Sequence, residues 1–391
     1  MNNLQRGIID LVKTALIGEP ITLPADFDWS AAGPLGASHS ILPMLYYGAL
    51  HAGVSLPDEV RPRLEAATMR GVFIDQNQLH EIGRIRACFL ENGIHFLPLK
   101  GCLLKGLYPQ TDMRPMGDAD ILIKMDQYDA IRPLMEQLGY EAVLESDHEL
   151  VWQKKSALYL ELHKRLIPSY NKDYYAYFGD GWKLARKTDT TEYIMGDEDQ
   201  FIYLFTHYAK HYRDSGIGIR HLVDLYMYLR AKPQMDWEYV ERELDKLQLL
   251  PFCRNTLTVI DVWFKGAADT AMTDFITDRI FGSGSFGTRE NALLSEGLKS
   301  SKSGTKEQVQ TRKRLAMIFP SAAVLTPKYP ILGKCPWLLP FMWVHRWVAA
   351  LLFKRDIIRR EQGRVNVMTA DNISAYQDDL NYVGLDFNFE E

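Results

Sequence analysis

The chain has 391 residues, of which 47% are hydrophobic and 24% charged, and its formal net charge is -5 with a pI near 6.1. One compact core rarely grows to this length, so two or three packed units are expected. The composition is that of an ordinary soluble globular protein. The acidic balance argues against a generic nucleic-acid-binding protein, which normally carries a basic surplus, although it leaves room for a local basic pocket.

The cysteines and the N-terminal stretch indicate the compartment. The four cysteines are far apart and form no Cys-x-x-Cys pair, which favours reduced, buried thiols over a zinc knuckle or a disulfide framework. Residues 1–18 have the pattern of an amphipathic helix interrupted by Asp10 and Lys13, and they lack the continuous apolar centre of a signal peptide. We therefore expect a cytoplasmic protein.

Residues 1 to about 85 are predicted to form an N-terminal helical region. Apolar residues recur at spacings of three and four in 7–16, in 41–53 and in 61–93. The last of these segments ends at Asn92-Gly93, a typical C-terminal stop signal for a helix.

The pattern then changes over 86–195. The predicted elements, in chain order, are a buried strand within 94–101, a short helix within 102–109, a strand over 119–125, a helix over 127–140 and antiparallel strands within 141–166. Strands and helices in this order make an α/β core. The predicted fold class is therefore α+β: a small mixed sheet with helices, flanked by N-terminal and C-terminal helical regions.

Helical periodicity returns from Asp197, and residues 196–391 are predicted to form a C-terminal helical domain. Helices are expected within 197–213, 219–230 and 237–264. The stretch at about 282–306 is rich in Gly and Ser and is predicted to be a mobile loop.

The most hydrophobic stretch is 335–356. Pro340 and the pair His345-Arg346 interrupt it, so it falls short of the continuous apolar run of a membrane-spanning helix, and no transmembrane segment is expected. A helix buried in the core is the simpler interpretation. Peripheral membrane contact through 336–353 is the alternative, because Trp and Arg flanks also suit a helix lying on a membrane surface.

Asp118 and Asp120 are placed one residue apart at the start of the predicted strand "DADILIK". Alternate residues of a strand point to the same face, so the two carboxylates would project side by side. Two such charges repel each other unless a cation lies between them, and hard carboxylate oxygens suit Mg²⁺ or Mn²⁺. The alternative is a turn followed by a helix-capping or salt-bridged aspartate.

Glu161 is the candidate for a third carboxylate. In "ALYLELHKRL", Tyr159, Glu161 and His163 fall on one face of a strand, and leucines fall on the other. A glutamate at the centre of such a strand needs either a solvated face or a partner. Two-metal phosphoryl transfer needs carboxylates that converge from neighbouring strands, although an alternating polar face needs no function.

A cationic segment precedes these carboxylates. In "LPLKGCLLKGLY" a strand ends at Lys100-Gly101 and leads into a short helix, which would place backbone N–H groups and a lysine at a phosphate-binding position. Arg114, four residues before Asp118, adds a cation that could contact a triphosphate with two hydrogen bonds.

The order "LKG", a short helix with "LYP", then "MRPMGDADILI" and "LELHKRL" resembles the uncharacterised nucleotidyltransferase family of the DNA polymerase β-like nucleotidyltransferase superfamily. The resemblance implies that Gly101 is the turn glycine, that Asp118 and Asp120 bind metal, and that Glu161 is the third carboxylate. The usual turn of the superfamily is Gly-Gly or Gly-Ser. Here it is Lys-Gly-Cys, so Lys100 is expected to replace the serine hydroxyl.

The helical part carries a second group of polar residues. His207 and His211 are four residues apart on one predicted helix, and Arg220 and Asp224 lie on the next. We expect them to line the nucleotide cleft, with Arg220 and either His207 or His211 facing phosphate or base, and Asp224 fixing Arg220. The alternatives are polar groups that satisfy one another at a helix crossing, or a zinc site with Asp224 as third ligand.

These observations predict a metal-dependent nucleotidyltransferase that transfers an NMP from an NTP to a hydroxyl acceptor and releases pyrophosphate, with Mg²⁺ or Mn²⁺ as cofactor. The acceptor could be a sugar or small metabolite, a protein side chain or an RNA end, and no stable nucleic-acid partner is expected. The alternative is a catalytically inactive nucleotide-binding or scaffold protein on the same fold, which the altered glycine turn favours.

Overall fold

The computed structural model describes residues 1–24, 26–155, 158–301, 319–326, 329–353 and 367–385. Its contacts divide the chain into two compact units. The first comprises Met1–Lys210, Ile217–Phe286 and Val383–Glu391, and the second comprises His211–Gly216 and Gly287–Tyr382. The sequence analysis placed region boundaries near residues 85 and 195. This division does not test those two boundaries, which stay a prediction.

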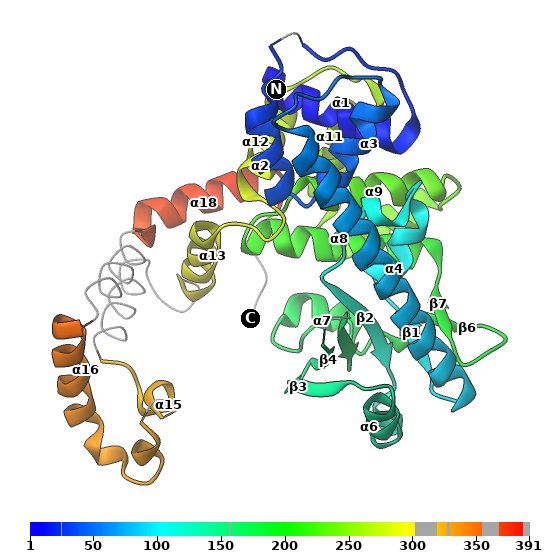
Figure 1. The fold of residues 1–391 in the computed structure, drawn as a ribbon. Coiled ribbons are helices and arrows are strands. Elements are labelled where there is room, and N and C mark those ends of the chain that lie inside the picture. The colour runs from blue at the N-terminus through cyan, green and yellow to red at the C-terminus, as the bar shows by residue number, and fades with distance from the viewer. Residues whose placement is uncertain (25, 156–157, 302–318, 327–328, 354–366, 386–391) are drawn as a thin grey trace. The chain divides into compact units, whose positions relative to one another are not determined.

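The N-terminal part of the first unit is helical, as predicted. Its helices are α1 (Asn3–Ile17), α2 (Trp29–Ser38), α3 (Leu42–His51) and the long α4 (Arg61–Glu91), shown in blue in Figure 1. Helix α4 ends where the sequence indicates: Asn92 is its C-cap, and Gly93 has a φ of 68°, a left-handed conformation that glycine adopts without strain.

Helices α1 and α3 lie unusually close together because Gly48 has no side chain. A Cβ at Gly48 would lie 2.1 Å from the backbone oxygen of Leu11. Helix backbones approach this closely only where the contact residue is small. The packing of α1 on α3 therefore depends on this one glycine.

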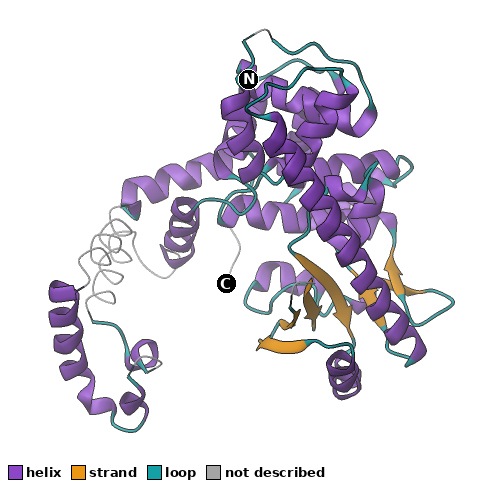
Figure 2. Ribbon diagram, in the orientation of Figure 1, coloured by secondary structure: helices purple, strands orange, loops and turns teal. Residues whose placement is uncertain are grey.

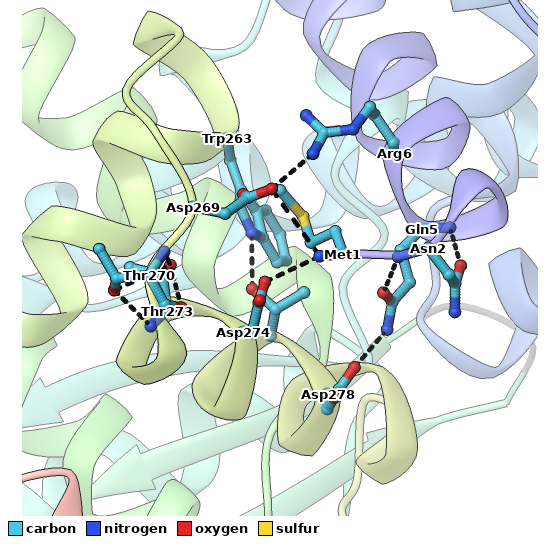
Figure 3. Close-up of polar contacts among 11 residues, drawn as sticks. Met1, Asn2, Gln5, Arg6, Trp263, Asp269, Thr270, Thr273, Asp274 and Asp278 are labelled. Atoms are coloured by element: carbon cyan, nitrogen blue, oxygen red, sulfur yellow. Dashed lines mark hydrogen bonds and ion pairs between the residues drawn. The ribbon is translucent and has the colours of Figure 1, made fainter.

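The amino-terminal end of α1 is fixed on α12 (Ala271–Ser283) (Figure 3). The Met1 amino group lies 2.8 Å from Asp274 Oδ1, and Gln5 donates to Asp278 at 2.7 Å. A capping box between Asn2 and Gln5 satisfies backbone donors at the start of α1. Segments about 270 residues apart in sequence are thus joined by directed polar contacts.

The sheet has five strands in the order β1-β2-β5-β4-β3. They are β1 (Phe96–Pro98), β2 (Asp118–Ile123), β3 (Glu141–Glu145), β4 (Glu149–Lys154) and β5 (Leu158–His163). Strands β2 and β5 pair in parallel, and the other pairs are antiparallel. Figure 2 shows these strands, with the small hairpin β6 (Ala185–Lys187) and β7 (Tyr193–Met195), among a majority of helices. The α+β fold class is confirmed.

The sheet has an apolar face and a polar face. Ala119 and Ile121 of β2 and the leucines of β5 join one buried cluster. Helix α4 contributes Ile85 and Phe89 to this cluster, and α6 (Tyr128–Gln137) contributes Ile131 and Met135. Because side chains alternate along a strand, the residues between them, including both aspartates of β2, face the opposite side. The core thus fixes the direction of the polar residues.

Helices follow the sheet along the chain, and all of them belong to the first unit except the last residues of α8, from His211 on. They are α7 (Lys172–Phe178), α8 (Asp197–Asp214), α9 (Ile219–Ala231), α10 (Trp237–Lys246), α11 (Leu250–Lys265) and α12. Helix α8 begins with Asp197, Glu198 and Asp199, acidic residues that interact favourably with a helix N-terminus. The predicted helices in this region are confirmed.

The second unit contains α13 (Arg289–Ser301), α15 (Ala322–Leu325), α16 (Leu339–Phe353) and α18 (Ala370–Tyr382). The mobile loop expected at about 282–306 is wrong for 289–301, which is helix α13; residues 302–306 lie outside the described residues. Leu294 and Leu298, one turn apart, are buried, and Ile373 of α18 lies over Gly297. Residues 289–301 therefore form a helix because their apolar residues are spaced to bury one face, despite the Gly and Ser content.

The stretch 336–353 forms a short 3-10 turn and α16, and Trp337, Phe341 and Val344 are exposed. Within the described part of the chain, no helix is both long enough and apolar enough to cross a membrane. Peripheral membrane contact through 336–353 stays a prediction.

Gly48→Ala should lower stability by about 1–3 kcal/mol, because the methyl group would push the backbones of α1 and α3 apart. Gly83→Ala is the matched control: nothing lies within 4 Å of its Cβ position in α4, so it should gain about 0.5–1 kcal/mol from helix propensity. Urea unfolding measures both. Equal effects of the two substitutions would contradict the close contact at Gly48.

Candidate active site

The parallel pairing of β2 and β5 brings three carboxylates to one face of the sheet. Asp120 is paired directly with Glu161, and Asp118 lies two residues before Asp120 on the same strand. Paired residues of neighbouring strands point to the same face. Asp120 is 3% exposed, Asp118 is half-buried, and the Glu161 side chain is 24% exposed. The three carboxylates lie together at the polar face, as the sequence predicts.

Two side chains contact the same carboxylate oxygen of Asp120. Its Oδ1 accepts from Lys100 Nζ at 2.8 Å and lies 2.7 Å from His163 Nε2. Burial alone would raise the pKa of Asp120, but Lys100 and His163 together hold this pKa well below its usual range. Among the described residues no side chain donates to the other oxygen, Oδ2, which leaves it available as a ligand.

Asp118 has a different environment. No hydrogen bond or ion pair joins its carboxylate to another side chain among the described residues. Burial raises the pKa of Asp118 to about 6, and the charges of Asp120 and Glu161 add to this effect. Burial and the neighbouring carboxylates therefore disfavour the ionised form of Asp118, and a divalent cation beside it would relieve this penalty.

His163 and His148 belong to the site, and the sequence analysis did not select them. His163 Nδ1 lies 3.2 Å from His148 Nε2, so an unbroken chain of contacts runs from Asp120 through His163 to His148. Burial, together with the charges of His163 and Lys100, lowers the pKa of His148 to about 3, so this ring is neutral. His163 could have been predicted from the sequence, because it is two residues from Glu161 on the same strand and so points to the same face. Nothing in the sequence pattern singles out His148.

Tyr203 of α8 is a further residue close enough to the carboxylates for their charges to act on it. It is fully buried, and in the described part of the chain its hydroxyl has no hydrogen-bond partner. Burial raises the pKa of Tyr203 to about 12, and the charges of Lys100, Asp120 and Glu161 also act on this phenol. A helix outside the sheet therefore contributes to the surroundings of the carboxylates.

The turn at Lys100 and Gly101 differs from the expected phosphate-binding helix N-terminus. Helix α5 (Gly101–Leu104) has only four residues. Cys102 N–H donates to Leu99 O at 3.0 Å, and the N–H groups of Leu103 and Leu104 donate to Lys100 O at 3.1 and 2.9 Å. These amides are therefore not available to a phosphate.

Gly101 is required for close packing. A Cβ there would lie 2.6 Å from Met116 Sδ and 3.0 Å from Arg114 Nη1. Any larger residue would displace both side chains. The glycine of the motif thus lets the turn lie directly on the segment that precedes β2.

Arg114 is buried and bound to Asp224 of α9. Its Nε and Nη2 donate to Asp224 Oδ1 and Oδ2 at 2.7 and 2.9 Å. Tyr108 also donates to Asp224 Oδ1 at 2.7 Å, and Arg220 lies 3.4 Å from Oδ2. The sequence analysis expected Arg114 at the triphosphate and Asp224 beside Arg220. Because the Arg114 side chain is 6% exposed and its Nε and Nη2 are paired with Asp224, we do not propose a phosphate contact for it.

His207 and His211 both lie on α8 and are half-buried. The groups of side chains that could hold a metal ion among the described residues are His148, Glu149 and His163, and Asp120, Glu161 and His163. Neither group includes His207, His211 or Asp224. The zinc alternative therefore has no support in the described structure, and a nucleotide contact for the two histidines stays a prediction.

A sheet with Asp-x-Asp on one strand and a third carboxylate on the next resembles the nucleotidyltransferases. Comparison with known proteins gives the particular family: the model of a family described as uncharacterised nucleotidyltransferase matches residues 25–265. The chain belongs to this family, which confirms the resemblance noted from the motifs. No curated protein matches the sequence.

Among solved structures, the solution structure of the antibiotic-resistance factor ANT(2'')-Ia is similar to this chain at 13% sequence identity. The match covers 48% of this chain and 97% of that chain, with a TM-score of 0.34. At this score no property of that protein is assigned to this chain.

Asp224→Asn should destabilise the protein by about 3–5 kcal/mol, because it leaves the buried Arg114 without its countercharge. Glu241→Gln is the control, since its pair with Arg254 is exposed on both sides and should change stability by about 0–1 kcal/mol. The measurement is the free energy of unfolding in urea. A loss at Asp224 no larger than the loss at Glu241 would show that the Arg114 pair is solvated.

Proposed function

We propose that the protein is a metal-dependent nucleotidyltransferase, which transfers an NMP from an NTP to a hydroxyl acceptor with release of pyrophosphate. The observation that carries this proposal is the convergence of Asp118, Asp120 and Glu161 on one face of the sheet. Membership of a nucleotidyltransferase family supports it.

The chemistry of the donor set fits Mg²⁺ or Mn²⁺. The available ligands are the carboxylate of Asp118, the Oδ2 of Asp120 and the carboxylate of Glu161, all hard oxygen donors. When bound, the ions would supply positive charge to the phosphates and to the attacking oxygen. The observations that support a cation here are that Asp118 has no partner among the described side chains and that the charges of Asp120 and Glu161 act on it.

The chain's own residues would bind the nucleotide and the acceptor. We propose that Arg220 of α9, and not Arg114, binds the triphosphate. The charge of Asp118 acts on Arg220, although burial lowers the pKa of the Arg220 guanidinium. Lys100 is the second candidate, and Gly101 keeps this turn next to β2. Glu161, whose side chain is 24% exposed, would orient the acceptor hydroxyl and accept its proton.

The class of acceptor stays open among a sugar or small metabolite, a protein side chain and an RNA end. The net charge of -5 disfavours a large RNA footprint without a local basic surface. An inactive nucleotide-binding or scaffold protein is the competing function, and the pairing of Lys100 with Asp120 favours it, because the protein's own ammonium already neutralises one carboxylate.

Thermal unfolding with each NTP, in Mg²⁺, Mn²⁺ or a chelator, tests the proposal. A ligand at one hundred times its Kd should stabilise the folded protein by about 2.7 kcal/mol. We expect a metal-dependent rise in Tm for one NTP, and Asp118→Asn should abolish it because one ligand oxygen is lost. Asp118 is chosen because its substitution breaks no pairing with another described side chain.

Asp126→Asn, which removes the same charge from an exposed position after β2, should leave the rise in Tm intact. With the donor identified, release of pyrophosphate in the presence of candidate acceptors then measures transfer. No stabilisation by any NTP at millimolar concentration would refute the enzyme and favour the scaffold.

A further inference from the structure

Lys100 contacts a carboxylate that the proposed chemistry assigns to a metal ion. Its ammonium lies 2.8 Å from Asp120 Oδ1, at the polar face of the sheet where the carboxylates converge. We propose that Lys100 is a built-in cation that neutralises the carboxylates until a divalent ion binds, and that it then moves to the triphosphate of the nucleotide. This inference rests on the proposed nucleotidyltransferase function and adds to it a coupling between metal binding and nucleotide binding.

The backbone of Lys100 is held in a conformation that a lysine rarely adopts. Its φ is 38° and its ψ is -108°, a region where an L-residue is strained and a glycine is not. Its carbonyl accepts from two amides of α5, and Leu99 N–H donates to Asp120 O at 2.9 Å. The turn is therefore fixed beside β2, and a glycine would remove the strain. The ion pair with Asp120 is the contact that offsets this strain.

The carboxylates around Lys100 require a cation, and a divalent ion would compete with the ammonium for them. Lys100 and His163 share the same oxygen of Asp120, while Asp118 has no partner among the described side chains. A divalent ion bound to Asp118 and Asp120 would lie a few ångströms from the ammonium. Two cations at that separation repel each other strongly at a buried site, so the ammonium would have to leave.

Lys100 is able to leave. Its side chain is 18% exposed, so part of it already reaches solvent, and four flexible methylene groups carry the ammonium. A triphosphate bound to the metal would offer it new oxygen acceptors within the same site. The ammonium would then exchange one anionic partner for another.

This exchange predicts opposite effects on two ligands. A metal ion alone must displace the ammonium. The apparent affinity of the protein for the metal ion therefore equals the intrinsic affinity multiplied by the fraction of molecules in which Asp120 is free. The nucleotide gives the displaced ammonium a partner, so each ligand should strengthen the binding of the other, and by the same factor.

The experiment measures binding of Mn²⁺ without nucleotide, from the electron paramagnetic resonance signal of the free ion. The variants are Lys100→Gln and Lys100→Gly, the second of which relieves the backbone strain and so guards against misfolding. If Asp120 is free in about a tenth of the molecules, both variants should bind Mn²⁺ roughly tenfold more tightly than the natural protein. Lys124→Gln, which removes an equal charge at the other end of β2, should leave Mn²⁺ affinity unchanged.

The second measurement is nucleotide binding at saturating Mn²⁺, by calorimetry. Both Lys100 variants should bind the nucleotide more weakly than the natural protein does. Tighter Mn²⁺ binding together with weaker nucleotide binding supports the exchange. Unchanged or weaker Mn²⁺ binding in both variants overturns it, because Lys100 would then be a fixed support for Asp120.

The two proposals can fail separately. If the natural protein binds no nucleotide, the proposed function fails, while the Mn²⁺ titration still decides whether Lys100 competes with the ion. If nucleotide binds equally well to the natural protein and the variants, the function stands and the coupling through Lys100 is overturned.

Discussion

The parallel pairing of β2 with β5 is the constraint on which the candidate site depends. It aligns Asp120 with Glu161, and a shift of one residue would turn Glu161 into the core and a leucine toward the aspartates. The apolar face prevents such a shift, because Ala119, Ile121 and the leucines of β5 are packed under α4 and α6. The arrangement of the carboxylates is thus a consequence of core packing as much as of the polar residues themselves.

A second constraint joins the sheet region to the helices that follow it. Arg114, just before β2, is clamped by Asp224 of α9, and Tyr108 and Arg220 converge on the same carboxylate. Arg114 also lies against Gly101. One buried charge network therefore positions the turn that carries Lys100, the start of β2 and the helix that presents Arg220. Substitutions in this network will affect binding and stability together, although Arg114, Asp224 and Tyr108 need not contact substrate.

Much of this arrangement follows from local sequence patterns. Alternation in β2 and β5 predicted which faces Asp118, Asp120 and Glu161 occupy, and the spacing of apolar residues with Asn92-Gly93 predicted α4 and its end. The partners of charged residues were harder to predict, since they are fixed by contacts between distant segments. Arg114 is 110 residues from Asp224, and His148 meets His163 only because β4 and β5 pair at a particular register. The composition of 289–301 led to a wrong prediction. Its Gly and Ser residues indicated a loop, but the segment is a helix with buried leucines.

The closed apolar face of the sheet limits the direction of any reaction at this site. Helices α4 and α6 cover one side of β2 and β5, so donor and acceptor must both approach from the side of the carboxylates. In-line displacement at a phosphorus atom places the attacking and leaving oxygens on opposite sides of that atom. Under the proposed function, both oxygens therefore lie on the side of the carboxylates, since neither can lie behind the sheet. Acceptor and pyrophosphate would enter and leave through that one face.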